Sequence, residues 1–231
     1  MRAPSSAALV ALVLGLTAPA ASQAAAASAA DFGAEPASTD VRRIAAWAAA
    51  GGDSQGLGFV IVDKADAKVF VFGPDGRLRG AAPALLGAAR GDDSVPGIGQ
   101  HKLADIRPDE RTTSAGRFVS GLGGDLGQKD VVWVDYGAAI SLHRVITTNP
   151  REHRVQRLAT TTIADNRISY GCINVQADFF DRVVRPIFSG ASGIVYILPE
   201  VRAIDAVFAI HEAGGSHGAP CRLGADIAAV R

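Results

Sequence analysis

The chain has 231 residues, with 23 basic and 23 acidic side chains and a hydrophobic fraction of 48%. This length suits one domain of moderate size that buries most of its apolar surface. The net charge is zero, the sequence has no basic cluster, and aromatic residues make up only 6% of the chain. This composition argues against nucleic acid as a partner.

The N-terminal segment has the pattern of a secretory signal peptide. Arg2 precedes an apolar run over residues 7–16, and small-residue cleavage patterns follow it. Because the run is too short to span a bilayer, we expect a signal peptide over residues 1–24, cleaved within 20–30, and an exported protein. An uncleaved anchor is the alternative. No later apolar segment approaches the length of a spanning helix, so we expect no stable membrane insertion after cleavage.

Residues 25–56 are rich in Ala, Ser and Gly and predict a linker. Within this segment, apolar residues recur at helical spacing over residues 40–50, and a pair of glycines follows at Gly51 and Gly52. We therefore expect one short helix that begins with Asp40 as its N-cap and ends at the glycines.

From Gly58 onward, short β-rich runs dominate the sequence. Apolar runs bounded by turn residues predict strands at residues 59–62, 69–72, 84–86, 117–119, 131–136, 138–143 and 193–200. One helix is expected over 177–188, broken at Pro186, and another over 201–210. Because strands outnumber helices, the core is expected to be mainly β, as a sandwich or a barrel-like domain.

The sequence RISYGCINV contains Cys172, one of two cysteines in the chain. A metal-binding role is disfavoured, since structural zinc uses paired ligands at short spacing and the five histidines form no such pattern. A disulfide with Cys221 is a serious alternative in an oxidising compartment. Against it, Gly171 allows close approach of another chain segment, and the flanking Ser169 and Asn174 are polar, features that a disulfide does not need.

A nucleophilic cysteine requires a base, because only the thiolate attacks and a free thiol has a pKa of about 8.5. His143 ends the expected strand 138–143, a rigid position from which to orient an imidazole. Taken alone, a histidine there is more often a half-buried structural residue. His153, in the polar stretch 144–166, is the other candidate base and lies closer to the cysteine in sequence.

These residues occur in an order that resembles the L,D-transpeptidase (YkuD-type) catalytic domain. The segment TTSAGRF, residues 112–118, is similar to the family's Thr-Pro-x-Gly-x-Phe segment. The strand-end histidine follows, then the motif Ser-x-Gly-Cys-Ile-Asn-Val, a helix and a last strand. The upstream stretch VFVFGPDGRLRGAAPALLG resembles the family's first hairpin, and the likeness covers about residues 57–198.

The resemblance implies a YkuD-like β-sandwich or barrel-like catalytic domain over residues 57–200, with a short helix after the catalytic cysteine and a few peripheral helices. Residues 25–56 would then be a linker and residues 201–231 a C-terminal extension. Two positions depart from the family pattern. Tyr170 stands where relatives usually have His, and Ser114 stands where they usually have Pro. A phenol can still donate a hydrogen bond, so the orientation of the motif can survive the first change.

By this resemblance, the protein acts on peptidoglycan stem peptides in the periplasm or cell-wall space. Cys172 attacks the amide carbonyl that precedes the terminal D-residue, and the D-amino acid leaves with a proton from His143. The acyl-enzyme then passes to the side-chain amine of a second stem, which forms a cross-link, or to water, which gives L,D-carboxypeptidase activity. An exchange enzyme on the same fold and a non-catalytic secreted module with a Cys172–Cys221 disulfide remain alternatives.

The resemblance also implies residues that support the reaction. The backbone N–H groups of Gly171 and Cys172 are candidates to hold the developing oxyanion. The main-chain carbonyl of Arg144 would orient the histidine ring. Ser169 would shape the turn before the cysteine, with a plain turn serine as the alternative, and Tyr170 would take the place of the missing imidazole in orienting the motif.

Substrate contacts are expected from Arg167 and Arg144, because a guanidinium matches a stem-peptide carboxylate, although a solvated surface Arg is the alternative for each. Asn174 completes the expected substrate-binding set and would anchor the motif loop through its amide. The basic, Thr-rich stretch 144–166 is expected to form a lid or a wall of the site. No metal and no cofactor are expected, since thiolate chemistry on an amide requires neither.

Overall fold

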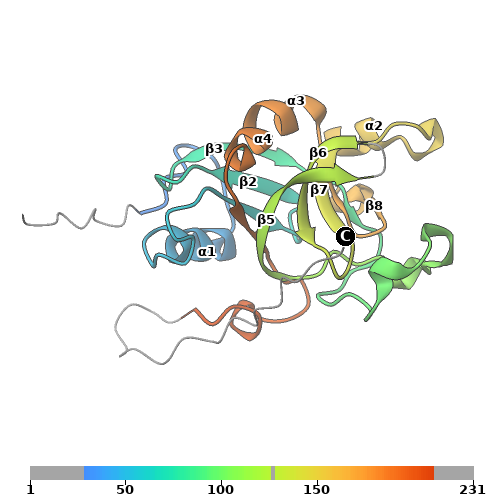
Figure 1. Cartoon of the computed structure of the whole chain (residues 1–231), viewed down its shortest axis with the longest axis horizontal. Helices are drawn as coiled ribbons and strands as arrows, with labels where there is room; N and C mark the ends of the chain where they lie inside the picture. The colour runs from blue at the N-terminus through green and yellow to red at the C-terminus, as the bar shows by residue number, and fades with distance from the viewer. Residues whose placement is uncertain (1–28, 126–127, 211–231) are drawn as a thin grey trace, which may run out of the picture.

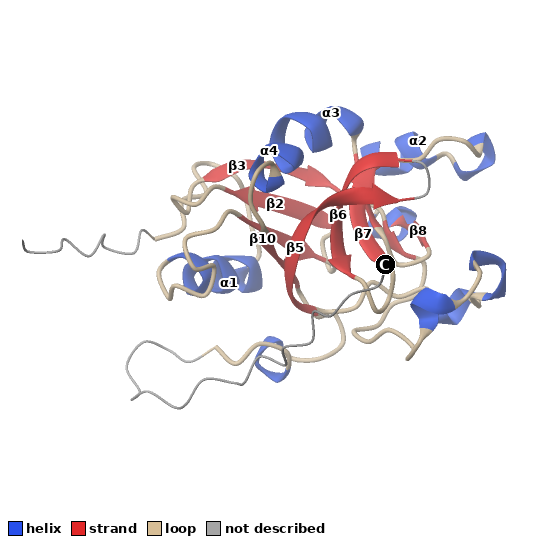
Figure 2. Cartoon of the chain, in the orientation of Figure 1, coloured by secondary structure: helices blue, strands red, loops and turns tan. Residues whose placement is uncertain are grey.

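The computed structural model describes residues 29–125 and 128–210. The strands are β1 (Phe59–Asp63), β2 (Lys68–Phe72), β3 (Leu78–Pro83), β4 (Leu86–Gly87), β5 (Gly116–Asp125), β6 (Gln128–Asp135), β7 (Ile140–Arg144), β8 (Arg167–Ser169), β9 (Ile173–Val175) and β10 (Gly193–Ile197). The α-helices are α1 (Thr39–Ala49), α2 (Arg154–Ala159), α3 (Ala177–Phe179) and α4 (Arg185–Phe188), with a π-helical turn at Phe180–Val184. Single 3-10 turns are Ile98–Gln100, Leu103–Asp105, Pro108–Glu110, Pro150–Glu152, Ile163–Asn166 and Ile204–Ala206. Strands dominate the described residues (Figure 2), and the mainly β class expected from the sequence is confirmed.

Eight strands form one mixed sheet in the order β3-β2-β1-β10-β5-β6-β7-β9, and β4 pairs with β8 in a small separate ladder. Two pairs in the large sheet, β1–β10 and β7–β9, are parallel, and the other neighbours are antiparallel. Strand β5 is long and strongly curved, and it turns the second half of the sheet across the first (Figure 1). The sheet is therefore barrel-like, with β7 and β9 adjacent at one end.

The strands of the first half of the sheet are apolar on both faces. On β1, Val60 and Val62 enter one core cluster, whereas Phe59 and Ile61 enter another on the opposite face. Strands β2 and β10 divide their side chains in the same way. Such strands are continuous hydrophobic runs, because each face meets a covering layer rather than water.

The first core cluster lies between the two halves of the sheet. It joins apolar residues of β1, β2 and β10 to residues of β6, β7 and β9, and Phe180, Val184 and Phe188 close it. Figure 1 shows α3 and α4 on this side of the sheet and α1 on the other. Because β7 and β9 both contribute to this core, the strand ends that carry the candidate site are rigidly supported.

The second core cluster is built on α1. Val41, Ile44, Ala45 and Ala48 are buried against the aromatic side chains of β1, β2 and β10. The N-cap is Ser38, whose Oγ accepts a hydrogen bond from the backbone N–H of Val41 at 3.3 Å. The prediction that Asp40 is the N-cap is therefore wrong, and Asp40 lies in the first turn of the helix. The helix in the segment expected as a linker is thus part of the packed structure.

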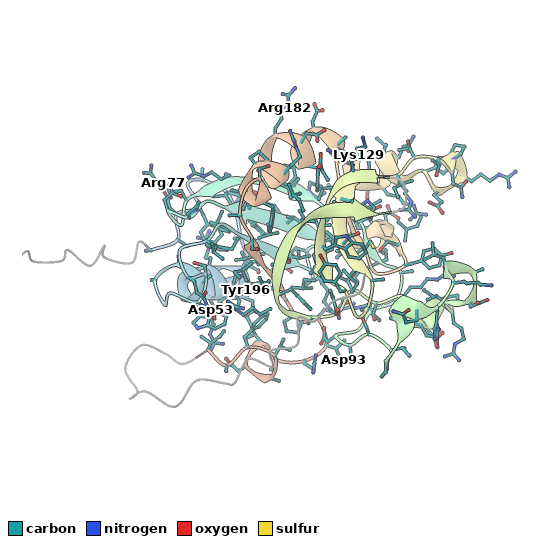
Figure 3. All side chains as sticks on the ribbon, in the orientation of Figure 1. Asp53, Arg77, Asp93, Lys129, Arg182 and Tyr196 are labelled. Carbon is teal, nitrogen blue, oxygen red and sulfur yellow. The ribbon has the colours of Figure 1, made fainter. Side chains whose placement is uncertain are left out.

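The loop after α1 is tied to the sheet through Asp53. Its carboxylate accepts hydrogen bonds from Tyr196 Oη at 2.5 Å and from Arg117 Nε at 2.6 Å, and Figure 3 shows Asp53 and Tyr196 close together beside α1. Burial raises the pKa of Tyr196, so its hydroxyl stays protonated and donates. This contact links residues far apart in the sequence.

Three expected elements differ in the structure. The helix after the cysteine is not broken at Pro186, because a π-helical turn precedes α4 and Pro186 lies in the first turn of α4, where a missing N–H is tolerated. The helix expected over 201–210 is a single 3-10 turn, since the backbone N–H groups of Val201 and Arg202 are bound by the Asp92 carboxylate. The strand expected at 84–86 is shifted, with β3 ending at Pro83 and β4 at Leu86–Gly87.

The polar stretch 144–166 is helical in part. It contains two 3-10 turns and α2, and Leu158 is its buried apolar anchor. No helix in the described part of the chain is long and apolar enough to cross a bilayer. The expected signal peptide and Cys221 lie outside the described residues.

Candidate active site

Cys172 lies in the link between β8 and β9, beside the start of β7. Its Sγ is 3.5 Å from the backbone N of Ser141 and 3.6 Å from the Ser141 hydroxyl, and it lies 3.6 Å from the carbonyl oxygen of Ala139. A thiol can donate to that carbonyl. A thiolate can instead accept from both Ser141 groups, which favour the charged form of the sulfur.

A tight turn sets the position of the Ala139 carbonyl. The Asp135 carboxylate accepts hydrogen bonds from the backbone N–H groups of Gly137 at 2.9 Å and Ala138 at 3.1 Å. Ala139 itself has a φ of 52°, a left-handed conformation that side chains other than glycine rarely adopt. The turn thus holds β7 in place at the end that contacts the cysteine.

His143 lies on β7 opposite Asn174 of β9 and is 4% exposed. Its Nδ1 is 2.7 Å from the carbonyl oxygen of Arg144, which can only accept, so Nδ1 carries the proton and donates. Its Nε2 is then the unprotonated nitrogen, and it lies 3.4 Å from Asn174 Nδ2. The histidine therefore has the tautomer of a base, oriented by the main-chain carbonyl that the family resemblance implied.

The structure brings His143 and Cys172 to the same corner of the sheet. Ser141, which contacts the sulfur, and His143 are two residues apart on β7 and so lie on one face. The amide of Asn174 faces both His143 Nε2 and the Cys172 carbonyl. His153, the other candidate base, is exposed and lines a cavity of about 190 Å³, and none of Ser141, His143, Cys172 and Asn174 lines it.

The backbone conformation at position 171 requires a glycine. Its φ is 131°, and a Cβ at this position would lie 2.8 Å from the Thr112 carbonyl oxygen. The Thr113 hydroxyl donates to the Gly171 carbonyl at 2.7 Å and accepts from the Gly87 N–H at 2.9 Å. Because a trans peptide points its N–H away from its C=O, this bond also sets the direction of the Cys172 N–H.

The expectation that Gly171 supplies an oxyanion donor does not match its hydrogen bonding. Its N–H donates to the Ser169 hydroxyl at 3.1 Å, and that hydroxyl donates to the Cys172 carbonyl at 2.6 Å. Ser169 thus closes the turn around the cysteine, as a turn-shaping residue would. The sequence suggested the N–H groups of Gly171 and Cys172 as oxyanion donors. The direction of the Cys172 N–H is set by the hydrogen bond from Thr113 to the Gly171 carbonyl.

The two arginines expected to meet a substrate carboxylate already have protein partners. Arg167 binds both oxygens of Glu200, at 3.0 and 2.6 Å, and the carbonyl of Lys64. The guanidinium of Arg144 binds Asp181 and lies over the Phe180 ring. Both side chains are therefore engaged in holding strands and helices together.

Arg167 belongs to a buried charge cluster beneath the site. The ammonium of Lys64, which is 0% exposed, contacts Asp92 Oδ1 at 2.8 Å and the Gly91 carbonyl at 2.5 Å. Burial lowers the pKa of Lys64, and the bond to Asp92 only partly offsets this effect. Burial alone would raise the pKa of Asp92, but hydrogen bonds from Lys64 and from backbone N–H groups outweigh it and lower this pKa to about 2.

Tyr170 is 37% exposed. The guanidinium of Arg111 lies over its ring at 4.0 Å from the centroid, while Arg111 donates to the Ile106 carbonyl. The contact uses the ring face and not the hydroxyl. Next to Gly171, this protein therefore presents an aromatic ring stacked with a cation.

Three residues of the site were not singled out from the sequence. Ser141 had a signal, because a residue two positions before a strand-end histidine shares its face. Thr113 lay in the quoted segment TTSAGRF but had no assigned role. Arg154, whose Nη1 donates to Asn174 Oδ1 at 2.8 Å, had no signal, because the contact depends on how the stretch 144–166 folds. Within the described residues, no group of three or more His, Cys, Asp or Glu side chains could hold a metal.

No protein-family model matches this chain, and no curated protein matches it. Among solved structures, the helical cell shape determining protein Pgp2 from Campylobacter jejuni is 14% identical, with a TM-score of 0.41 over 63% of this chain and 49% of that chain. An L,D-transpeptidase from Xylanimonas cellulosilytica is 15% identical, with a TM-score of 0.35 over 61% of this chain and 60% of that one. An L,D-transpeptidase from Mycobacterium smegmatis is 14% identical, with a TM-score of 0.35 over 61% and 58%. The chain spans about half to three-fifths of the length of these neighbours.

Proposed function

We propose that this protein is a cysteine-dependent L,D-transpeptidase that acts on peptidoglycan stem peptides. The observation that carries the proposal is that Cys172 Sγ contacts Ser141 of β7, while His143, two residues further along the same strand, has Nδ1 bound to the Arg144 carbonyl, which makes Nε2 the basic nitrogen. This arrangement supports nucleophilic catalysis, because an adjacent oriented base activates a thiol. The motif order in the sequence supports the substrate class.

In the proposed acylation step, the thiol proton passes to His143 Nε2 and Sγ attacks the carbonyl carbon of the amide before the terminal D-residue. The C–N bond then breaks, a thioester forms, and the D-amino acid leaves with the proton from His143. Hydrogen bonds from Ser141 to Sγ favour the thiolate before attack. The Cys172 N–H is the donor proposed for the developing oxyanion.

In the proposed second step, the side-chain amine of another stem attacks the thioester carbonyl and gives up a proton to His143. The C–S bond breaks and Cys172 regains its thiol, with a new amide as the product. Water in place of the amine gives hydrolysis, and the same residues serve both outcomes. We propose that the protein does this work after export, in the periplasm or the cell-wall space, without a metal or a cofactor.

The test is to incubate the purified protein with tetrapeptide stems and to identify products by mass spectrometry. We expect release of the terminal D-amino acid and a cross-linked product. Cys172→Ala should lose this activity by at least about a thousandfold, and His143→Gln should lose most of it. Full activity in Cys172→Ala would refute the assignment, and a product shortened without cross-linking would identify a carboxypeptidase.

Thiol mapping without reductant tests the non-catalytic alternative. If the proposal holds, iodoacetamide captures Cys172 stoichiometrically in the folded protein, and His143→Gln slows the capture near neutral pH. If Cys172 is instead bridged to Cys221, both cysteines resist alkylation until a reductant is added. That result would favour a secreted module stabilised by a disulfide.

A further inference from the structure

Arg154 links the stretch 144–166 to the candidate site. Its side chain is 11% exposed, although it belongs to the short surface helix α2. Nη1 donates to Asn174 Oδ1 at 2.8 Å, and Nε contacts the carboxylate of Glu152. A guanidinium held on one side by a carboxylate and inserted on the other toward a buried amide is a specific contact, not a solvated surface group.

This contact determines which way the Asn174 amide faces. Asn174 is fully buried, and its backbone N–H and C=O both pair with Leu85, at 2.9 and 2.8 Å. Because a guanidinium only donates, the atom facing Arg154 must be Oδ1. The Cys172 carbonyl only accepts, so the atom facing it at 3.3 Å must be Nδ2. The two neighbours select the same orientation.

The orientation of the amide acts in turn on His143. With Oδ1 on Arg154, Nδ2 is the atom that faces His143 Nε2, at 3.4 Å. An N–H group next to Nε2 favours the unprotonated state of that nitrogen, and the Arg144 carbonyl at Nδ1 favours the same tautomer. One chain of contacts therefore runs from Arg154 to the nitrogen that would take the thiol proton.

We propose that Arg154 is a positioning residue for the Cys172–His143 pair, acting through the amide of Asn174. The inference rests on the proposed function and deepens it, because it assigns the stretch 144–166 a role in setting the base. Removing the guanidinium leaves Asn174 Oδ1 without its donor in a buried site. Only the Cys172 carbonyl then selects the orientation of the amide, so the turned state, with Oδ1 toward His143 Nε2, becomes more populated, and an acceptor there favours a protonated nitrogen.

The charges around His143 act in the same direction. Arg154 contacts Asn174, whose amide faces the ring, and its other partner is the carboxylate of Glu152. The Arg144 guanidinium is bound to Asp181, and Cys172 lies in the link between β8 and β9. Losing the positive charge of Arg154 therefore also favours protonation of His143, so both effects have one sign.

The experiment compares the wild type with Arg154→Ala, Arg154→Lys and Arg157→Ala by ¹⁵N NMR of His143 across a pH series. Arg157 is a matched control, because it also holds the stretch 144–166, through the carbonyls of Glu152 at 2.8 Å and Asp165 at 3.0 Å, but does not touch Asn174. Thermal unfolding of each variant reports its stability.

We expect the Nδ1–H tautomer of His143 in the wild type and in Arg157→Ala. In Arg154→Ala, that preference is weakened and His143 takes up its proton at a higher pH. Arg154→Lys keeps a cation and one donor, and it should restore most of the wild-type behaviour. With a stem peptide as substrate, kcat of Arg154→Ala should fall roughly tenfold while KM is nearly unchanged.

An unchanged tautomer and titration of His143 in Arg154→Ala would overturn the proposal, as would an equal change in Arg157→Ala, which would indicate general loosening of the stretch. The NMR measurement needs no substrate. If the wild type processes no stem peptide, the proposed function fails, but the positioning role is still decided by the spectra.

Discussion

Gly171 lies where three chain segments meet beside Cys172. Thr113 holds its carbonyl, Ser169 accepts from its N–H, and the Thr112 carbonyl lies where a side chain would be. A carbonyl fixed on one side of a peptide plane fixes the N–H of the next residue on the other. At this scale, hydrogen bonds of Thr113 and Ser169 hold the backbone around Cys172, whereas Ser141 contacts its sulfur directly.

Thr113→Val tests that dependence. The change keeps the shape of the side chain but leaves the Gly87 N–H and the Gly171 carbonyl, both buried, without a partner. We expect the free energy of unfolding to fall by about 2 kcal/mol and the acylation rate to fall with it. Urea unfolding and alkylation of Cys172 measure the two effects.

Thr112→Val is the control for Thr113→Val. The Thr112 hydroxyl donates to the Asp93 carbonyl at 2.7 Å near the surface, where water can replace it. Thr112→Val should lower the free energy of unfolding by no more than about 0.5 kcal/mol. Equal effects of the two substitutions on stability and on alkylation would contradict the role given to Thr113.

At the scale of elements, the site depends on which strands are neighbours. The parallel pairing of β7 with β9 places His143 beside Asn174. The parallel pairing of β1 with β10 inserts β10 between β1 and β5. Helix α1 covers the first half of the sheet and buries Val41 and Ile44. The helix therefore contributes to the stability of the sheet that carries the site.

Ile44→Ala tests whether α1 is integral to the fold. The side chain is fully buried in the second core cluster, so its truncation should lower the free energy of unfolding by about 3 kcal/mol in a single cooperative transition. Arg43→Ala is the control on the same helix, since its ion pair with Asp205 is partly exposed and should cost less than about 1 kcal/mol. A separate early transition confined to α1 would instead indicate an independent segment.

At the scale of the whole molecule, one buried cluster joins segments from four places in the sequence. Lys64 follows β1, Asp92 lies in the loop after β4, Arg167 begins β8, and Glu200 follows β10. The Asp92 carboxylate also accepts from the backbone N–H groups of Glu200 and Val201. The cluster therefore holds the segment after β10 against the loop that follows β4.

The pH dependence of stability follows from Asp92. Its pKa of about 2 in the folded protein lies below the ordinary value of 3.8, so the unfolded chain binds more protons between these values. The ionised Asp92 carboxylate therefore adds about 2 kcal/mol to the free energy of unfolding above pH 4, and this contribution is lost as the pH falls toward 2. Urea unfolding between pH 2 and 7 should show this decline.

A paired substitution isolates the Asp92 effect. Lys64→Met combined with Asp92→Asn removes both charges together, which avoids leaving one of them buried alone. In this variant, the free energy of unfolding should decline less between pH 4 and 2, because the contribution of Asp92 is absent. An unchanged decline would show that other carboxylates account for it.

The sequence by itself determined the β-rich class, because apolar runs and turns are local patterns, and it singled out Cys172 and His143 as the candidate pair by residue type and context. Only the tertiary structure placed His143, and not His153, beside β9, since that position depends on which strand pairs with β9. It also decided that Arg167 binds Glu200 and that Arg154 reaches Asn174. Those partners are distant in sequence, and hydrogen bonds between distant residues exist only once packing has brought the strands and the stretch 144–166 together.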